Sequence, residues 1–314
     1  MRVAGIDCGT NSIRLLVADL GEQSATAPLT DVVRRMEIVR LGEGVDETRR
    51  LAPAAIERTR RALAGYAAEI AAHGAERVRM CATSASRDAA NADEFVAMVE
   101  ATLGVAPEVV TGDEEARLTF AGAVGGLADI APAPYLVVDI GGGSTEFVVG
   151  VDTVARAVSV DIGCVRMTER HLRADPPTAA QIAAAEHDIA EAVDRALAAV
   201  ADQPGPAGQP GPPTLVGLAG SVTTVAGIAL GLDEYLPERL HHARISYQQV
   251  AEVTADLLAM PVARRLRIPV MHPGRADVIA AGALVLRIIM ERAGVPSVVA
   301  SEHDILDGIC LSLR

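Results

Sequence analysis

The chain has 314 residues, half of them apolar and none of them tryptophan, so alanine and the aliphatic side chains must supply most of the core. This length exceeds what one hydrophobic core usually fills, which predicts two domains, with one large domain as the alternative. A net charge of −13 argues against nucleic acid or an anionic membrane surface as the partner, because basic surface holds such partners.

Other bulk features narrow the class of protein. The longest apolar stretches, such as 278–286, fall short of the roughly 20 residues that cross a bilayer, so no membrane span is expected. The N-terminus has no secretory-signal pattern, which predicts a cytoplasmic protein. The four cysteines form no C-x-x-C pair, which predicts buried reduced thiols. All 28 basic residues are arginine, which excludes a P-loop lysine and leaves arginine clamps for phosphate.

The first half of the chain predicts the element order β-β-β-α-β-α-β. Strands rich in β-branched residues are expected at 3–6, 12–19 and 32–40, with turn residues between them. A helix over 54–73 follows, because Pro53 suits its first turn and Gly74 its end. A strand at 78–81, a helix that begins at Asn91 with Glu94 in a capping-box pattern, and a strand over 105–111 complete this half.

The second half repeats this plan. A helix from about Glu114 leads to strands at 135–139, 145–151 and 155–161, and a long helix begins at Thr178. The Pro- and Gly-rich residues 203–214 predict a surface loop before a strand at 215–219. Ser246 and Gln249 predict the start of another helix, and further helices are expected over 274–292 and 302–313.

An internal repeat links the two halves. When the first strand and its turn are laid over the segment VVDIGGGSTE, Asp7 falls on Asp139, Gly9 on Gly141 and Ser12 on Ser144. Both copies then enter an apolar strand. The repeat predicts two duplicated domains that face each other.

The repeated turns have the chemistry of phosphate loops. Glycine lets backbone N–H groups approach an anion, and a hydroxyl adds a further donor. Asp7, Asp139 and Glu146 would repel a phosphate, but a divalent cation between acid and phosphate removes the repulsion. The sequence therefore predicts Mg²⁺ at Asp139 and Glu146, with phosphate on the glycines. A glycine hairpin with solvated acids explains either loop taken alone equally well.

Three further segments are weaker candidates. Gly220 and Ser221 begin a predicted helix, whose N-terminal N–H groups favour anions, although an ordinary helix cap explains them too. Residues 83–88 offer hydroxyls and Arg87 that could bind phosphate, although a solvated turn explains this segment too. Residues 112–117 open a helix with three acids, among them Glu115, which the helix dipole alone would explain.

Together these segments resemble the exopolyphosphatase/guanosine pentaphosphate phosphatase (Ppx/GppA) family, whose fold is shared with sugar kinases, Hsp70 and actin. The matching stretches are GIDCGTNSIRLL, ATSASRDAAN, TGDEEARLTF, VVDIGGGSTEFV, DIGCVRMTE, LAGSVTTVA, GRADVIAAGALVL and SEHDILDGI. They follow one another over nearly the entire chain. Ser221-Val222 stands where the family usually has Thr-Ala, and the resemblance is to the short form without a C-terminal helical domain.

The resemblance implies an α/β fold of two RNase H-like domains, 1–124 and 125–314, around a cleft, with the last helix, 303–314, packed back on the first domain. It implies that Glu115 orients or deprotonates the attacking water and that Arg87 clamps phosphate. The metal would lie at Asp139 and Glu146, with Asp7. The phosphate-binding residues would be Gly9, Thr10, Asn11, Ser12, Arg14, Gly141, Gly142, Gly143, Ser144, Gly220 and Ser221.

The implied reaction is Mg²⁺-dependent hydrolysis of the terminal phosphoanhydride of inorganic polyphosphate, with short chains preferred. Mn²⁺ is the alternative ion, no organic cofactor is expected, and the family often forms homodimers. The nearest rival is a guanosine pentaphosphate (pppGpp) phosphatase of the stringent response, with pppGpp or ppGpp as its partner, and the sequence does not choose between them. A small-molecule kinase, an Hsp70- or actin-like ATPase and an alarmone-sensing pseudoenzyme are further alternatives. A Glu115 that acts on water, rather than an acceptor pocket, favours hydrolysis over phosphate transfer by a kinase.

Overall fold

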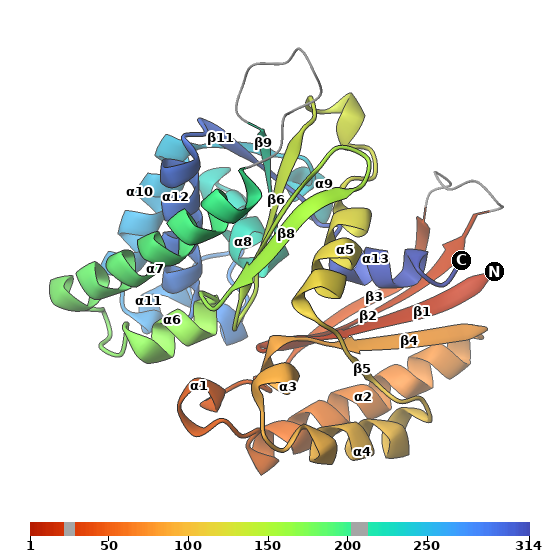
Figure 1. Cartoon of the computed structure of the whole chain (residues 1–314). Coiled ribbons are helices and arrows are strands. Elements are labelled where there is room, and N and C mark those ends of the chain that lie inside the picture. The colour runs from red at the N-terminus through yellow and green to blue at the C-terminus, as the bar shows by residue number, and fades with distance from the viewer. Residues whose placement is uncertain (22–28, 202–212) are drawn as a thin grey trace. The chain divides into compact units, whose positions relative to one another are not determined.

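The computed structural model describes residues 1–21, 29–201 and 213–314 (Figure 1). The chain folds into two compact units, Met1–Gly125 with Asp304–Arg314 as unit 1 and Gly126–His303 as unit 2. Each unit is built on one mixed sheet with helices against it, which confirms the predicted α/β class. Most of the predicted Pro- and Gly-rich loop lies outside the described residues.

Unit 1 is built on a five-stranded sheet in the order β3-β2-β1-β4-β5. Its strands are β1 (Arg2–Cys8), β2 (Ser12–Leu20), β3 (Leu29–Ile38), β4 (Arg77–Ala82) and β5 (Glu108–Val109). The first three form an antiparallel meander, and β4 and β5 continue the sheet in parallel pairing. The strand predicted over 105–111 is reduced to two residues, because Pro107 has no N–H to donate to the ladder.

The helices of unit 1 are α1 (Val45–Thr48), α2 (Pro53–His73), α3 (Ser84–Asp88), α4 (Ala92–Leu103), α5 (Gly112–Ala123) and α13 (Ile305–Leu311). As predicted, α2 starts with proline and ends at Gly74, where φ is 66°. The capping box predicted at Asn91 is wrong. Its side chain instead accepts from Leu51 N at 2.8 Å and donates to Leu51 O at 3.1 Å, so it ties α4 to a distant loop.

Helix α13 packs so closely on α5 that only glycine fits at the contact. A Cβ on Gly122 would lie 1.8 Å from Asp304 O, and one on Gly308 would lie 1.9 Å from Leu118 O. Asp307, also on α13, forms an ion pair with Arg34 of β3 at 2.6 Å. The last segment of the chain therefore fixes α5, the helix that carries Glu115.

Unit 2 is built on a six-stranded sheet in the order β10-β11-β9-β6-β7-β8. Its strands are β6 (Tyr135–Ile140), β7 (Thr145–Gly150), β8 (Val154–Val160), β9 (Thr214–Leu218), β10 (Arg244–Ser246) and β11 (Ser297–Ala300). Strands β6, β7 and β8 form an antiparallel meander, and β9 and β11 add in parallel. These five strands have the arrangement of unit 1, as the internal repeat predicted, and β10 adds antiparallel to β11 at the edge.

The helices of unit 2 are η1 (Leu127–Asp129), α6 (Cys164–Arg170), α7 (Ala179–Val200), α8 (Ala219–Ala229), α9 (Pro237–Leu240), α10 (Tyr247–Ala259), α11 (Val262–Arg265), η2 (Pro273–Arg275) and α12 (Ile279–Ala293). The capping box predicted for Ser246 and Gln249 is present. Helix α12, which packs between α7 and α10, begins at Ile279 and not at Gly274 as predicted (Figure 1). The Gly274 N–H is already held by His272 Nδ1 at 3.1 Å in a 3₁₀ turn.

The sequence predicted no membrane span, and it predicted buried cysteines without disulfides. No helix in the described part of the chain has both the length and the apolar character of a membrane span. All four cysteines are buried and free of disulfides. Burial raises the pKa of the Cys81 and Cys310 thiols to about 12, so both stay protonated, as expected of inert core thiols.

Candidate active site

The two predicted phosphate loops are turns of the same geometry. In unit 1 the turn joins β1 to β2, and Gly9 N donates to Ser12 O at 3.0 Å. In unit 2 the turn joins β6 to β7, and Gly141 N donates to Ser144 O at 3.1 Å. The repeat seen in the sequence is thus a repeat of backbone conformation.

The loop of unit 2 presents its N–H groups away from α6. The carbonyls of Gly141, Gly142 and Gly143 each accept from a backbone N–H of residues 163–165, at 2.9 to 3.2 Å. In a trans peptide the C=O and the N–H of the next residue point in opposite directions. The N–H groups of residues 142–144 therefore point together to the other side, and such a run of N–H groups is an anion-binding nest.

A glycine and an arginine of α6 fix this loop from behind. A Cβ on Gly163 would lie 2.2 Å from the carbonyl carbon and oxygen of Gly142, so only glycine permits the contact. Arg166, which is 7% exposed, donates from Nε to Gly143 O at 2.7 Å. Neither residue was among the sequence candidates, although both belong to the stretch DIGCVRMTE.

The loop of unit 1 is held in the same way. The carbonyls of Thr10 and Asn11 accept from backbone N–H groups of residues 39–42 at 2.8 to 3.0 Å, so the N–H groups of Asn11 and Ser12 point away. Thr10 Oγ1 also lies 2.9 Å from Ser84 Oγ, and both hydroxyls are buried. The turn is thereby joined to the start of α3.

Asp7 and Arg14, predicted at the metal and phosphate sites, form an ion pair with each other. They are register partners on β1 and β2, and Arg14 Nη2 lies 2.7 Å from Asp7 Oδ2. Arg14 Nη1 also donates to Asp304. Burial raises the pKa of Asp7 more than the nearby guanidinium lowers it. In unit 1 the acid of the loop is thus neutralised by the protein itself.

Asp139 and Glu146 occupy the equivalent register positions of unit 2, where an acid replaces the arginine. They are 8% and 2% exposed, and Ser159 Oγ donates to Glu146 Oε1 at 2.8 Å. Carboxylates that face each other across two strands repel, and a cation relieves the repulsion.

Asp139 and Glu146 could supply two carboxylate ligands to Mg²⁺, which leaves its other ligand positions to phosphate and water. The described residues contain no group of three or more His, Cys, Asp or Glu side chains placed to hold a metal. Mg²⁺ is commonly held by one or two carboxylates, with phosphate oxygens and waters as its other ligands. Two facing acids beside an anion-binding loop fit that pattern.

The structure brings the predicted catalytic residues Arg87 and Glu115 together in unit 1. Arg87, on α3, donates from Nη1 to Glu115 Oε2 at 3.0 Å and to Val110 O at 2.9 Å. Glu115 lies in the first turn of α5 and is 7% exposed. A guanidinium and a helix N-terminus both stabilise the negative charge that a general base must carry.

The 3₁₀ turn η2 brings an unpredicted arginine, Arg275, to Gly220 at the start of α8. A Cβ on Gly220 would lie 2.0 Å from Arg275 Nη2, and Arg275 Nη1 donates to Thr224 Oγ1 at 2.9 Å. The helix N-terminus already carries partial positive charge, so a guanidinium beside it favours an anion there. Arg275 lies in the stretch GRADVIAAGALVL, one of those that carry the family resemblance, and this membership could have marked it as a candidate.

The family was determined by comparison with known proteins. The model of the Ppx/GppA phosphatase family matches residues 16–313. The chain belongs to this family. The resemblance predicted from the ordered motifs is confirmed.

Similar proteins align with this Ppx/GppA chain over nearly its full length. Exopolyphosphatase 2 of Mycobacterium tuberculosis is 50% identical over 99% of this chain and 98% of its own. The crystal structure of an exopolyphosphatase-like protein is 42% identical, covers 99% of this chain and 97% of its own, and has a TM-score of 0.92. The solved structure of the Aquifex aeolicus PPX-GPPA enzyme is 31% identical, covers 99% of both chains, and has a TM-score of 0.80.

Proposed function

We propose that this protein is an exopolyphosphatase, which hydrolyses the terminal phosphoanhydride of inorganic polyphosphate and releases orthophosphate. The observation that carries the proposal is the repeated turn, which in each unit directs backbone N–H groups away from the segment that binds its carbonyls. Polyphosphate is a chain of anions, and such loops suit its phosphate oxygens. Similarity to an exopolyphosphatase over 98% of that relative supports the same function.

Glu115 acts as the general base in this proposal. Its carboxylate takes the proton of the attacking water, and Arg87 holds that carboxylate in place. Attack on a phosphoryl group requires little covalent help from the protein, so positioning and charge neutralisation provide most of the acceleration. The loop N–H groups, with Arg275 of η2 beside the start of α8, provide the neutralisation that comes from the protein.

Asp139 and Glu146 would hold Mg²⁺, or Mn²⁺, at the loop of unit 2. When bound, the ion neutralises charge on the phosphates. Asp7 and Arg14 have a different role in the proposal, since they pair with each other and thereby fix the β1–β2 turn.

Orthophosphate release tests this function directly. Initial rates are measured on short polyphosphate, long polyphosphate, pppGpp and ATP, each with Mg²⁺, with Mn²⁺ and with a chelator. The proposal expects the highest kcat/KM on short polyphosphate and loss of activity with the chelator. A higher kcat/KM on pppGpp would assign the protein to nucleotide hydrolysis, and release from none of the four would contradict the proposal.

We also propose that the protein is a cytoplasmic homodimer, as the family resemblance implies. Light scattering during gel filtration tests the dimer. A mass near 32.6 kDa, that of one chain, at micromolar concentration would contradict it.

A further inference from the structure

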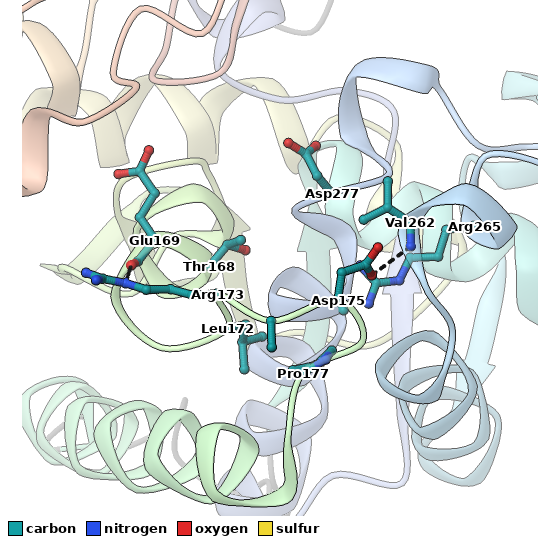
Figure 2. A pocket seen from close by; sticks show the side chains of 11 residues that line it. Thr168, Glu169, Leu172, Arg173, Asp175, Pro177, Val262, Arg265 and Asp277 are labelled. Carbon is teal, nitrogen blue, oxygen red and sulfur yellow. Dashed lines mark hydrogen bonds between the residues drawn. The ribbon is translucent and has the colours of Figure 1, made fainter.

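Unit 2 contains a cavity of about 320 Å³ outside the residues assigned to hydrolysis (Figure 2). It lies among α6, the segment that follows α6, α11 and the start of α12. Its volume is at the lower end of the roughly 300 to 1,000 Å³ that ligand pockets span. Leu172, Pro177 and Ala280 give it apolar surface, and five charged side chains also line it.

One of these charged side chains, Arg265, is buried without an acid partner. It is 3% exposed, and it donates from Nε to Leu257 O at 2.9 Å and from Nη1 to Ala276 O at 3.2 Å. No carboxylate of the described residues lies within ion-pair distance of it. Burial lowers the pKa of Arg265, and the charges of Asp175 and Asp277 act against that shift. Nη2 makes no hydrogen bond among the described residues, so it is available to donate to an anionic group in the cavity.

Asp175 complements Arg265 at the same cavity. Its Oδ1 accepts from Val262 N at 2.8 Å, a contact drawn in Figure 2. No arginine or histidine in the described ranges pairs with it, and its side chain is exposed. The cavity thus offers a guanidinium with one unused nitrogen, Nη2, and a carboxylate that forms no ion pair within 4.0 Å among the described residues.

The charges that line the cavity exclude simple ions as its ligand. Glu169, Asp175 and Asp277 outnumber Arg173 and Arg265, so an inorganic polyanion is repelled. A simple cation would leave Arg265 Nη2 without an acceptor. A compound with one anionic and one cationic end satisfies both groups through charge-assisted hydrogen bonds.

We propose that this cavity binds a small zwitterion of the free α-amino acid class. Its carboxylate accepts from Arg265, its ammonium group donates to Asp175, and its side chain packs on Leu172 and Ala280. The site is separate from the residues proposed for phosphoanhydride hydrolysis, so its test does not depend on that reaction.

Isothermal titration calorimetry of the full chain tests the site with glycine, L-leucine and L-glutamine. Acetate and methylammonium, which carry one charged end each, serve as the comparison compounds. We expect saturable binding of at least one amino acid, and dissociation constants at least tenfold higher for acetate and methylammonium. No binding of any of the three amino acids, or equally tight binding of acetate, would overturn it.

Two variants assign the ends of the ligand. Asp175→Asn keeps the contact to Val262 N and should weaken binding about tenfold or more, while Asp152→Asn, an exposed acid elsewhere in unit 2, should not. Arg265→Gln should abolish binding. If Arg265→Gln fails to fold, Asp175→Asn decides, and unchanged affinity in that folded variant would overturn the proposal.

Discussion

Replacing Gly163 by alanine tests whether α6 holds the glycine loop of unit 2 in a catalytic position. The new Cβ would lie 2.2 Å from the carbonyl group of Gly142 and 2.4 Å from Gly143 N, where ordinary van der Waals contact begins at 3.4 Å. Both neighbours are backbone, so the loop itself must retreat by about 1 Å. A displacement of this size at a reacting centre costs about 100-fold in rate, and kcat/KM should fall by about that factor.

The assay is kcat/KM for orthophosphate release from short polyphosphate, with circular dichroism and thermal melting to show that the variant folds. Gly65→Ala is the matched control, because a Cβ there meets nothing within 4 Å. The control should retain wild-type kcat/KM and gain slightly in helix stability. A folded Gly163→Ala protein with wild-type kcat/KM would refute the argument that this contact positions the loop.

Three other outcomes are expected. Gly122→Ala should lower the melting temperature or prevent folding, because its Cβ would lie 1.8 Å from Asp304 O, and an unchanged melting temperature would contradict this contact. Glu146→Gln should raise the Mg²⁺ concentration for half-maximal activity about tenfold or more, whereas an unchanged requirement would remove Glu146 from the metal site. Burial, with His303 nearby, lowers the pKa of His242, so the unfolded chain binds more protons as pH falls through 6.5 and stability decreases. The urea midpoint should be lower at pH 5.5 than at pH 7.5, and His242→Asn, which tolerates the φ of 65° there, should reduce the difference; the same difference in both proteins would contradict the role of His242.

The sequence sufficed for features that local signals specify. The turn glycines at Gly9 and Gly141, each between β-branched strands, predicted the duplicated sheets, because turn chemistry and strand propensity act over a few residues. The ends of α2 were equally local, at Pro53 and Gly74.

Long-range partners could not be predicted in this way. Arg14 was predicted to bind phosphate, and nothing in the sequence indicated its pairs with Asp7 and with Asp304, which is 290 positions away along the chain. Asn91 had the composition of a helix cap, yet its side chain binds a backbone 40 positions away. When a side chain bonds to a segment far away along the chain, the local sequence contains no periodicity or spacing that would predict the partner.

The role of Glu115 as general base is tested by the turnover of Glu115→Gln on short polyphosphate, compared with that of Glu114→Gln. The two residues are neighbours in the first turn of α5, and Glu114 pairs with Arg79 at 3.3 Å instead of Arg87. Glu115→Gln should lower kcat by about 10²- to 10⁴-fold with little change in KM, while Glu114→Gln should keep a kcat near that of the wild type. A folded Glu115→Gln protein that releases orthophosphate at the wild-type rate would contradict this role.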